Sequence, residues 1–176
     1  MVKYISKGDG MINQEYVKTY DSILGKLVLK SDGENLTSLS YCESGDETYV
    51  ESNLPIFDEV FKWLDIYFSG EIPNFTPKYK FYNISPFRRS VLEITSTIPY
   101  GQTLTYGTIA NRIASMKGIE KMSARAVGGA LHHNPICIIV PCHRVIGTNK
   151  ALVGYGGGIA KKVRLLELES SNVQKR

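Results

Sequence analysis

The run Ile136-Cys137-Ile138-Ile139-Val140-Pro141-Cys142-His143-Arg144-Val145 organises the rest of this chain of 176 residues. The five consecutive apolar residues 136–140 predict a buried β-strand. Pro141 would end the strand, because proline has no N–H to donate to a sheet. Cys142 would then stand at the strand end beside His143. A neighbouring imidazole favours the reactive thiolate, so Cys142 is a candidate nucleophile.

Two other interpretations of this run compete with a reactive thiol. A cysteine–histidine pair alone is more often a buried structural cysteine beside a chance histidine. A zinc site is the second interpretation. Five candidate ligands fall within twelve positions: His132, His133, Cys137, Cys142 and His143. No Cys-x2-Cys pair is present, and residues five apart on a strand face opposite sides. We therefore expect Cys137 and Cys42 to be small buried hydrophobes, and we expect neither a metal nor a cofactor.

Upstream of this run, the apolar spacing predicts two short helices joined by a polar turn. Leu104–Ala114 and Met122–Leu131 are the predicted helices, and Ser115–Lys121 connects them, which is compatible with a helix-turn-helix. The second helix contains Gly128-Gly129, and each glycine costs about 1 kcal/mol there relative to alanine. Close approach of another backbone, from protein or DNA, and packing against a neighbouring helix are equally good explanations.

The other predicted elements define an α+β fold with two lobes. They are a hairpin of Lys26–Ser31 and Leu36–Cys42 around Asp32-Gly33, a helix over 57–68 ending at Ser69-Gly70, a linker over 71–84, a helix opened by Ser85-Pro86 and ended by Pro99-Tyr100-Gly101, a glycine-rich loop over 154–158, and a closing helix over Ala160–Glu169.

Composition and charge narrow the class of protein. The chain is 43% hydrophobic and 22% charged, and no run approaches the ~18 apolar residues of a membrane helix. Met1–Tyr4 lacks a signal-peptide core, and three cysteines without framework spacing favour a reducing cytoplasm. Residues 1–99 hold 10 Lys/Arg and 14 Asp/Glu, a net −4, whereas residues 100–176 hold 11 and 3, a net +8. A basic C-terminal half suits a polyanionic partner, although charge alone also fits a solvated surface.

Together, several motifs make the chain resemble the methylated-DNA–protein-cysteine methyltransferases, or O6-alkylguanine-DNA alkyltransferases. They are Ile98-Pro99-Tyr100-Gly101, Thr105-Tyr106-Gly107-Thr108-Ile109-Ala110, Ala124–Ala130, Asn134-Pro135, Ile138–Gly147, Gly154–Gly158 and Leu165–Glu169. The resemblance covers about residues 85–170, and the run around Cys142 is its most specific part. Residues 1–80 fit only through their hairpin and helix.

The resemblance implies a fold and an organisation. We expect an N-terminal ribonuclease-H-like lobe of sheet and helix over 1–80. A C-terminal lobe over 85–170 would carry a winged-helix-like helix-turn-helix and the acceptor cysteine, and 171–176 would be a tail. The partner would be double-stranded DNA containing O6-alkylguanine, with O4-alkylthymine as a further candidate substrate. We expect a monomer that does not bind membranes and works in the cytoplasm, or in the nucleus of a eukaryote.

The resemblance also implies a role for each site residue. Cys142 would accept the alkyl group irreversibly, once per molecule. His143 would act as base through a water, and Glu169 would orient it. Asn134 would be a buried hinge, and Tyr106 would contact the flipped nucleotide and help to donate a proton. Arg125 would fill the gap in the base stack, on a helix whose small residues allow a close approach in the minor groove. That helix would contact DNA through Ser123, Ala124, Arg125, Ala126 and Gly128, together with Tyr106. The guanine pocket would be lined by Val145, Tyr155, Gly156, Gly157 and Gly158.

Three rivals compete with this hypothesis. A non-catalytic alkyl-lesion-binding damage sensor would lack the acceptor cysteine, which Cys142 argues against. A transcriptional sensor of alkylation would carry extra domains, for which 176 residues leave no room. A cysteine hydrolase would turn over its substrate, which a single-use acceptor does not. Relatives with a structural zinc site carry an N-terminal Cys/His set, which this chain lacks, and its Ser115–Lys121 turn is longer than in many relatives.

Overall fold

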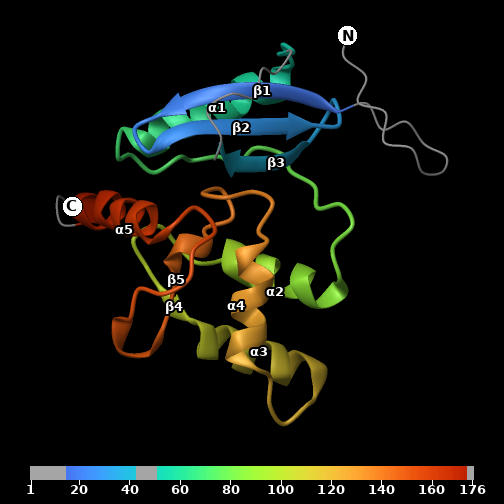
Figure 1. Cartoon of the computed structure of the whole chain (residues 1–176), viewed down its shortest axis with the longest axis vertical. Coiled ribbons are helices and arrows are strands. Elements are labelled where there is room, and N and C mark those ends of the chain that lie inside the picture. The colour runs from blue at the N-terminus through green and yellow to red at the C-terminus, as the bar shows by residue number, and fades with distance from the viewer. Residues whose placement is uncertain (1–14, 43–50, 174–176) are drawn as a thin grey trace. The chain divides into compact units, whose positions relative to one another are not determined.

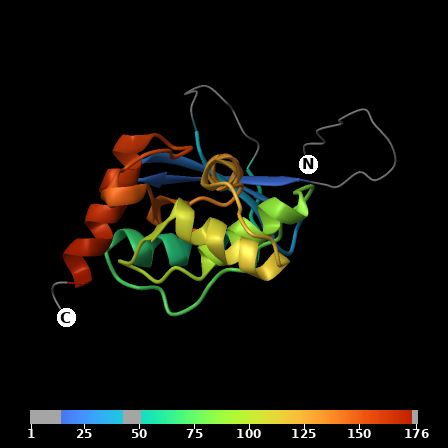
Figure 2. The same ribbon diagram turned by 90° about the horizontal axis from the view of Figure 1, so that it is seen from below.

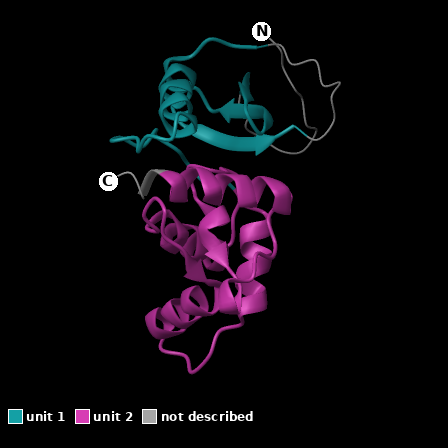
Figure 3. Ribbon diagram, turned by 90° about the vertical axis from the view of Figure 1, so that its left-hand side faces the viewer, with its two compact units in different colours: residues 1–82 teal, residues 83–176 magenta. Residues whose placement is uncertain are grey.

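The computed structural model describes residues 15–42 and 51–173, and the chain divides into two compact units, residues 1–82 and 83–176 (Figure 3). The sheet-containing first unit and the helical second unit confirm the predicted α+β fold class. Among the described residues, no helix is long and apolar enough to cross a membrane. The prediction for Met1–Tyr4 lies outside the described residues.

The described residues of the first unit, 15–42 and 51–82, form an antiparallel sheet and one helix (Figure 1). Its strands β1 (Tyr16–Ser22), β2 (Gly25–Ser31) and β3 (Leu36–Tyr41) follow the order β1-β2-β3, and the helix α1 spans Pro55–Phe68. The core comes from β2, β3 and α1, whose fully buried side chains include Leu27, Leu29, Leu36, Leu39, Val60 and Leu64. The predicted hairpin is confirmed as β2–β3, whereas β1 was not predicted. Only one of its seven residues is exposed and none is fully buried, so it lacks the alternation of a half-buried strand.

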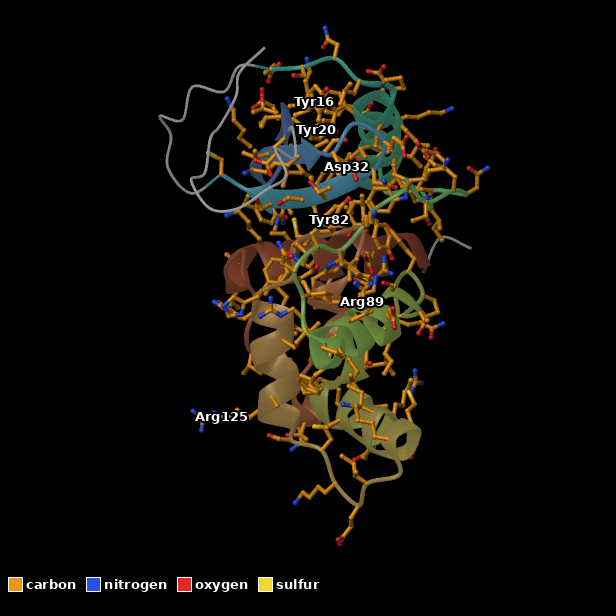
Figure 4. The ribbon with its side chains drawn as sticks, turned by 90° about the vertical axis from the view of Figure 1, so that its right-hand side faces the viewer. Tyr16, Tyr20, Asp32, Tyr82, Arg89 and Arg125 are labelled. Atoms are coloured by element: carbon orange, nitrogen blue, oxygen red, sulfur yellow. The ribbon has the colours of Figure 1, made fainter. Side chains whose placement is uncertain are left out.

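The β2–β3 turn also organises the segment that was predicted as a linker. Asp32 accepts hydrogen bonds from the backbone N–H groups of Glu34 and Asn35, and the hydroxyl of Tyr82 donates to it at 2.8 Å (Figure 4). Leu36 forms a parallel bridge with Tyr79, so part of the linker adds to the edge of the sheet. Residues 78–82 therefore belong to the first unit and do not form a linker.

Over residues 83–173, the second unit contains four α-helices: α2 (Pro86–Ser96), α3 (Tyr106–Lys117), α4 (Ala124–His132) and α5 (Ile159–Val173). The helices α2, α3 and α4 pack on one another around Val91, Leu92, Ile109, Ile113 and Val127 (Figure 2). A short parallel ladder joins β4 (Leu104–Thr105) to β5 (Val145–Ile146). The predicted helix over Leu104–Ala114 therefore begins two residues late, because its first two residues belong to β4. The closing helix is also longer than predicted and runs past Glu169.

Hydroxyl side chains cap the helices α2, α3 and α4. Ser85, Thr105 and Ser123 accept hydrogen bonds from the backbone N–H groups of Arg88, Thr108 and Ala126, respectively. Such a cap satisfies one N–H of the first turn, which has no partner within the helix. The predicted start at Ser85-Pro86 is confirmed. Gly118 ends α3 in the left-handed conformation, with φ 63°, and opens the turn to α4.

The predicted strand over 136–140 is wrong. This segment is a compact turn, in which the N–H of Val140 donates to the carbonyl of Ile136 and Ile138 has a φ of 68°. The side chain of Asn134 accepts from the N–H of Ile136 and donates to the carbonyl of Val140. The apolar run reflects burial in a turn in which Ile136 alone forms a β-bridge, and periodicity cannot distinguish a buried turn from a buried strand. Cys137 and Cys142 therefore do not lie on opposite faces of a strand.

Candidate active site

A pocket of about 670 Å³ opens in the second unit, and Cys142 is among its lining residues. Its walls come from the start of α3, from α4, from the 3-10 helix over Cys142–Arg144, and from the loop that leads to α5. The 3-10 helix starts directly after Pro141 and replaces the expected strand end as the element that presents the thiol. Only 6% of Cys142 is exposed, so a reacting group has to enter the pocket to meet it.

The Cys142 thiol is held by Asn134. The Nδ2 group of Asn134 donates to Sγ at 3.1 Å and to the carbonyl of Val140 at 2.8 Å. Burial raises the pKa of Cys142 above its ordinary value of 9.0, and the Asn134 hydrogen bond and the charge of Lys162 offset only part of this rise. At neutral pH the sulfur therefore carries its proton, and a base has to remove it before the sulfur attacks.

His143 lies next to the thiol in sequence and pairs with Glu169. Its Nε2 is 2.8 Å from Oε1 of Glu169, and both residues are fully buried. Burial lowers the pKa of His143 below 6.5 in spite of the carboxylate, so the imidazole is neutral at neutral pH. An ionised carboxylate only accepts, so Nε2 carries the hydrogen and proton uptake would occur at Nδ1. The two residues are 26 positions apart, and only the family resemblance predicted that they pair.

Arg144 completes the buried cluster and was not predicted to belong to the site. Its Nε and Nη2 donate to the Glu169 carboxylate at 2.9–3.1 Å, and its Nη1 donates to the carbonyl of Ile98 at 2.6 Å. The N–H of Gly101 donates to the same carboxylate at 2.9 Å. Burial alone would raise the pKa of Glu169, but His143 and Arg144 hold it at about 2. Arg144 directly follows the Cys-His pair, so its position in the sequence could have suggested that it belongs to the site. The direction of its side chain, however, depends on the 3-10 helix over Cys142–Arg144, which the apolar pattern did not predict.

Tyr106 and Lys162 converge on the loop that forms one wall of the pocket. The Tyr106 hydroxyl donates to the carbonyls of Val153, at 2.8 Å, and Gly154, at 3.1 Å. The Lys162 ammonium is fully buried and donates to the same two carbonyls and to that of Val145. Lys162 was missed because Lys161-Lys162 on an amphipathic helix is typical of a solvated face. Burial lowers the pKa of Lys162 to about 8.

The helix α4 presents small residues beside one long cation. Ser123, Ala124, Arg125 and Ala126 are exposed at its start, and Arg125 projects away from the helix (Figure 4). A side chain built at Gly129 would meet nothing within 4 Å, and one at Gly128 would make only ordinary contact with the Tyr106 ring at 3.7 Å. Packing within the unit therefore does not require either glycine. Close approach of another molecule is the better of the two explanations for the pair.

The predicted pocket residues fall into two groups. Tyr155 lines the pocket, whereas Val145 is fully buried near it. Gly156 approaches α4 so closely that a Cβ would lie 3.2 Å from the carbonyl oxygen of His132. Among the described residues, those that line the pocket do not include Val145, Gly156, Gly157 or Gly158. The lining residues without a predicted role are Gly107, Gly129, Leu131, His132, Gly147, Thr148, Val153 and Gly154.

Comparisons with known proteins cover almost the whole chain. Residues 86–171 match the family described as 6-O-methylguanine DNA methyltransferase, DNA binding domain, and residues 16–78 match its ribonuclease-like domain. A methylated-DNA–protein-cysteine methyltransferase of Mycobacterium leprae is 42% identical over 164 residues, which cover 90% of this chain and 94% of that protein. One from Methanosarcina acetivorans is 39% identical, covering 89% and 99%. The crystal structure of Mycobacterium tuberculosis OGT in complex with DNA superposes with a TM-score of 0.77 at 42% identity, covering 89% of this chain and 94% of that one.

Proposed function

This chain belongs to the 6-O-methylguanine DNA methyltransferase family, and from that premise we propose how its own residues carry an alkyl group from DNA to Cys142. The reaction is direct repair, in which a protein cysteine accepts the alkyl group. The substrate is double-stranded DNA with an O6-alkylguanine, and O4-alkylthymine is the second substrate to test. The product is a thioether, so each molecule reacts once.

The buried pair of His143 and Glu169 removes the proton from the Cys142 thiol. His143 takes the thiol proton at Nδ1 through a water, and Glu169 stabilises the imidazolium that forms, because its carboxylate faces Nε2 at 2.8 Å. The sulfur then attacks the alkyl carbon, an S–C bond forms, and the C–O bond breaks with its electron pair on guanine O6. The guanine anion takes up one proton with the help of the Tyr106 hydroxyl, which balances the proton that left the thiol.

The pocket requires the damaged base to leave the duplex. Cys142 is 6% exposed inside a pocket, so the O6-alkyl group of a stacked base cannot reach it, and the nucleotide has to flip at a cost of a few kcal/mol. The helix α4 enters the minor groove through its small residues, and Arg125 fills the space that the base leaves. The wall formed by Val153–Tyr155 receives the flipped guanine, and Asn134 holds the thiol toward it.

The assignment of parts follows from this chemistry. Residues 85–170 carry both DNA binding and alkyl acceptance, while residues 1–80 form the ribonuclease-like domain. Of the predicted tail over 171–176, residues 171–173 belong to α5. One chain supplies every group that the proposed reaction uses, so the proposed site does not need a second copy, and we propose a monomer. The acceptor thiol has to stay reduced, which supports a cytoplasmic location.

The observation that carries this function is geometric: Asn134 holds the Cys142 thiol at 3.1 Å in the pocket, and the next residue, His143, pairs with the buried Glu169 carboxylate at 2.8 Å. The test is the intact mass of the protein after incubation with a duplex that holds one O6-methylguanine, with Cys142→Ala as the control. We expect a gain of one methyl group per protein, mapped to Cys142 and absent from the variant. Tight binding to the lesion without a mass gain would instead establish a damage sensor, and neither binding nor gain would refute both.

A further inference from the structure

Lys162 is buried in a way that needs a reason. Its ammonium has three N–H groups, and all three are used on the backbone carbonyls of Val145, Val153 and Gly154, at 2.6, 2.8 and 3.0 Å. Among the described residues, no carboxylate pairs with it. A buried ammonium without a counter-ion is costly, and three neutral carbonyls compensate for it only in part.

Tyr106 uses two of the same acceptors. Its hydroxyl has a single hydrogen, which lies between the carbonyls of Val153 and Gly154, at 2.8 and 3.1 Å. The Lys162 Nζ is 5.7 Å from the centre of the Tyr106 ring, so the two donors reach the loop from adjacent positions. A carbonyl oxygen can accept two hydrogen bonds. The Val153 and Gly154 carbonyls therefore each accept from both Tyr106 and Lys162.

This double coverage bears on the reaction. The Tyr106 hydroxyl cannot donate to a flipped guanine while it donates to the loop, so its hydrogen has to turn away from both carbonyls. Without another donor, the two carbonyls would lose the hydrogen bonds that hold this exposed loop in place. Because Lys162 serves both, the wall of the pocket keeps its hydrogen bonds when Tyr106 leaves it.

We propose that Lys162 is a positioning residue for Tyr106, holding the Val153 and Gly154 carbonyls in place so that the tyrosine hydroxyl is free to turn to the departing guanine. The inference rests on the function proposed above for Tyr106 and extends it to a residue that the family resemblance did not bring forward. The step moves a hydrogen bond and leaves the proton balance of the reaction unchanged. A different role, in which the ammonium acts directly on the Cys142 thiolate, is the main competitor.

The experiment separates the two roles by the leaving group. Methyl transfer from an O6-methylguanine duplex releases guanine, which takes up a proton, whereas alkylation of Cys142 by iodoacetamide releases iodide, which does not. Both single-turnover rates are measured for wild-type protein, Lys162→Met, Tyr106→Phe and the double variant. Lys161→Met, the neighbouring and partly exposed lysine of α5, is the matched control.

We expect Lys162→Met to slow methyl transfer by about tenfold or more. A general acid usually contributes about a hundredfold or more, and Lys162 would support such an acid without replacing it. Its iodoacetamide rate should stay within about twofold of wild type, and it should add less than about twofold to the loss in Tyr106→Phe. Lys161→Met should match wild type in both reactions. If Lys162→Met does not fold, Lys162→Gln, which keeps N–H donors without charge, should retain methyl transfer better than Tyr106→Phe does.

Three results would overturn the proposal: an equal loss in both reactions, a loss that multiplies with that of Tyr106→Phe, or no loss at all. The first of these results would assign Lys162 to the thiolate. Failure of the wild-type protein to accept a methyl group would refute the proposed function itself, so the two failures remain distinct.

Discussion

At the scale of single residues, Cys142 and His143 both favour their neutral forms. Burial raises the pKa of the thiol above 9.0 and lowers that of the imidazole below 6.5. Between these values, the rate of methyl transfer should be level with pH, because a neutral base faces a neutral acid throughout. The rate should fall only at a pH below 6.5, where the lowered pKa of His143 is reached and the protonated imidazole no longer acts as a base. Single-turnover rates measured across this range check the profile.

The control is His143→Gln, which lacks the base. Only the protein molecules in which the Cys142 thiol is already ionised would then react, and this fraction rises about tenfold per pH unit below the thiol pKa. We expect the rate of the variant to climb across pH 6.5–9.0, where the wild type is level. Parallel profiles for the two proteins would exclude His143 as the base.

Arg144 and Arg164 offer a matched pair at the same scale. Arg144 is paired with the buried Glu169 carboxylate, whereas Arg164 pairs with Glu167 at the surface, where the two side chains are 69% and 57% exposed. Arg144→Met would leave a buried charge with one partner fewer, and we expect the free energy of unfolding to fall by about 3 kcal/mol or more. Arg164→Met should lower it by less than about 1 kcal/mol. Urea unfolding of both variants measures the difference, and equal losses would contradict this account of the cluster.

At the scale of elements, α4 shows a conflict between stability and function. Gly129 is exposed on this helix, and a side chain there would meet nothing within 4 Å. Gly129→Ala should therefore stabilise the fold by about 1 kcal/mol, because alanine is the better helix former. The same methyl group should weaken binding to duplex DNA if α4 lies against it. Thermal unfolding and DNA titration of one variant measure both, and tighter or unchanged DNA binding would return the glycine pair to an unexplained status.

Some of the elements could be predicted from the sequence and others could not. The helices α1 and α2 and the β2–β3 hairpin were predictable, because caps, proline positions and Asp32-Gly33 are local signals. The turn over 136–140 was not predictable, since it depends on the side chain of Asn134 closing hydrogen bonds across the segment. Apolar runs report burial, and burial is common to strands and tight turns.

The residues of the site also fall into those that the sequence predicted and those that it did not. The Cys142–His143 and Glu169 assignment came from motif order, and the structure brings His143 and Glu169 into hydrogen-bond contact. Arg144 and Lys162 were missed because their importance arises from burial, and charged residues are buried rarely enough that a sequence pattern argues against it. Long-range partners such as the Ile98 carbonyl have no local signal at all.

At the scale of the whole molecule, charge is divided between the two units. Residues 1–82 hold 8 Lys/Arg and 13 Asp/Glu, a net −5, whereas residues 83–176 hold 13 and 4, a net +9. A polyanion would therefore be attracted to the second unit and repelled by the first. This division predicts that the logarithm of the DNA affinity falls linearly with the logarithm of the salt concentration, with each neutralised phosphate contributing about −0.9 to the slope.

One lysine from each unit tests where those phosphates lie. Lys121 is exposed two residues before the Ser123 cap of α4, whereas Lys26 is exposed on β2. Lys121→Gln should reduce the salt slope for an undamaged duplex by about one, and Lys26→Gln should leave it unchanged. Titrations at several salt concentrations give both slopes. An equal reduction in the two variants would mean that DNA contacts both units, and the net charge of each unit would then not determine where the duplex binds.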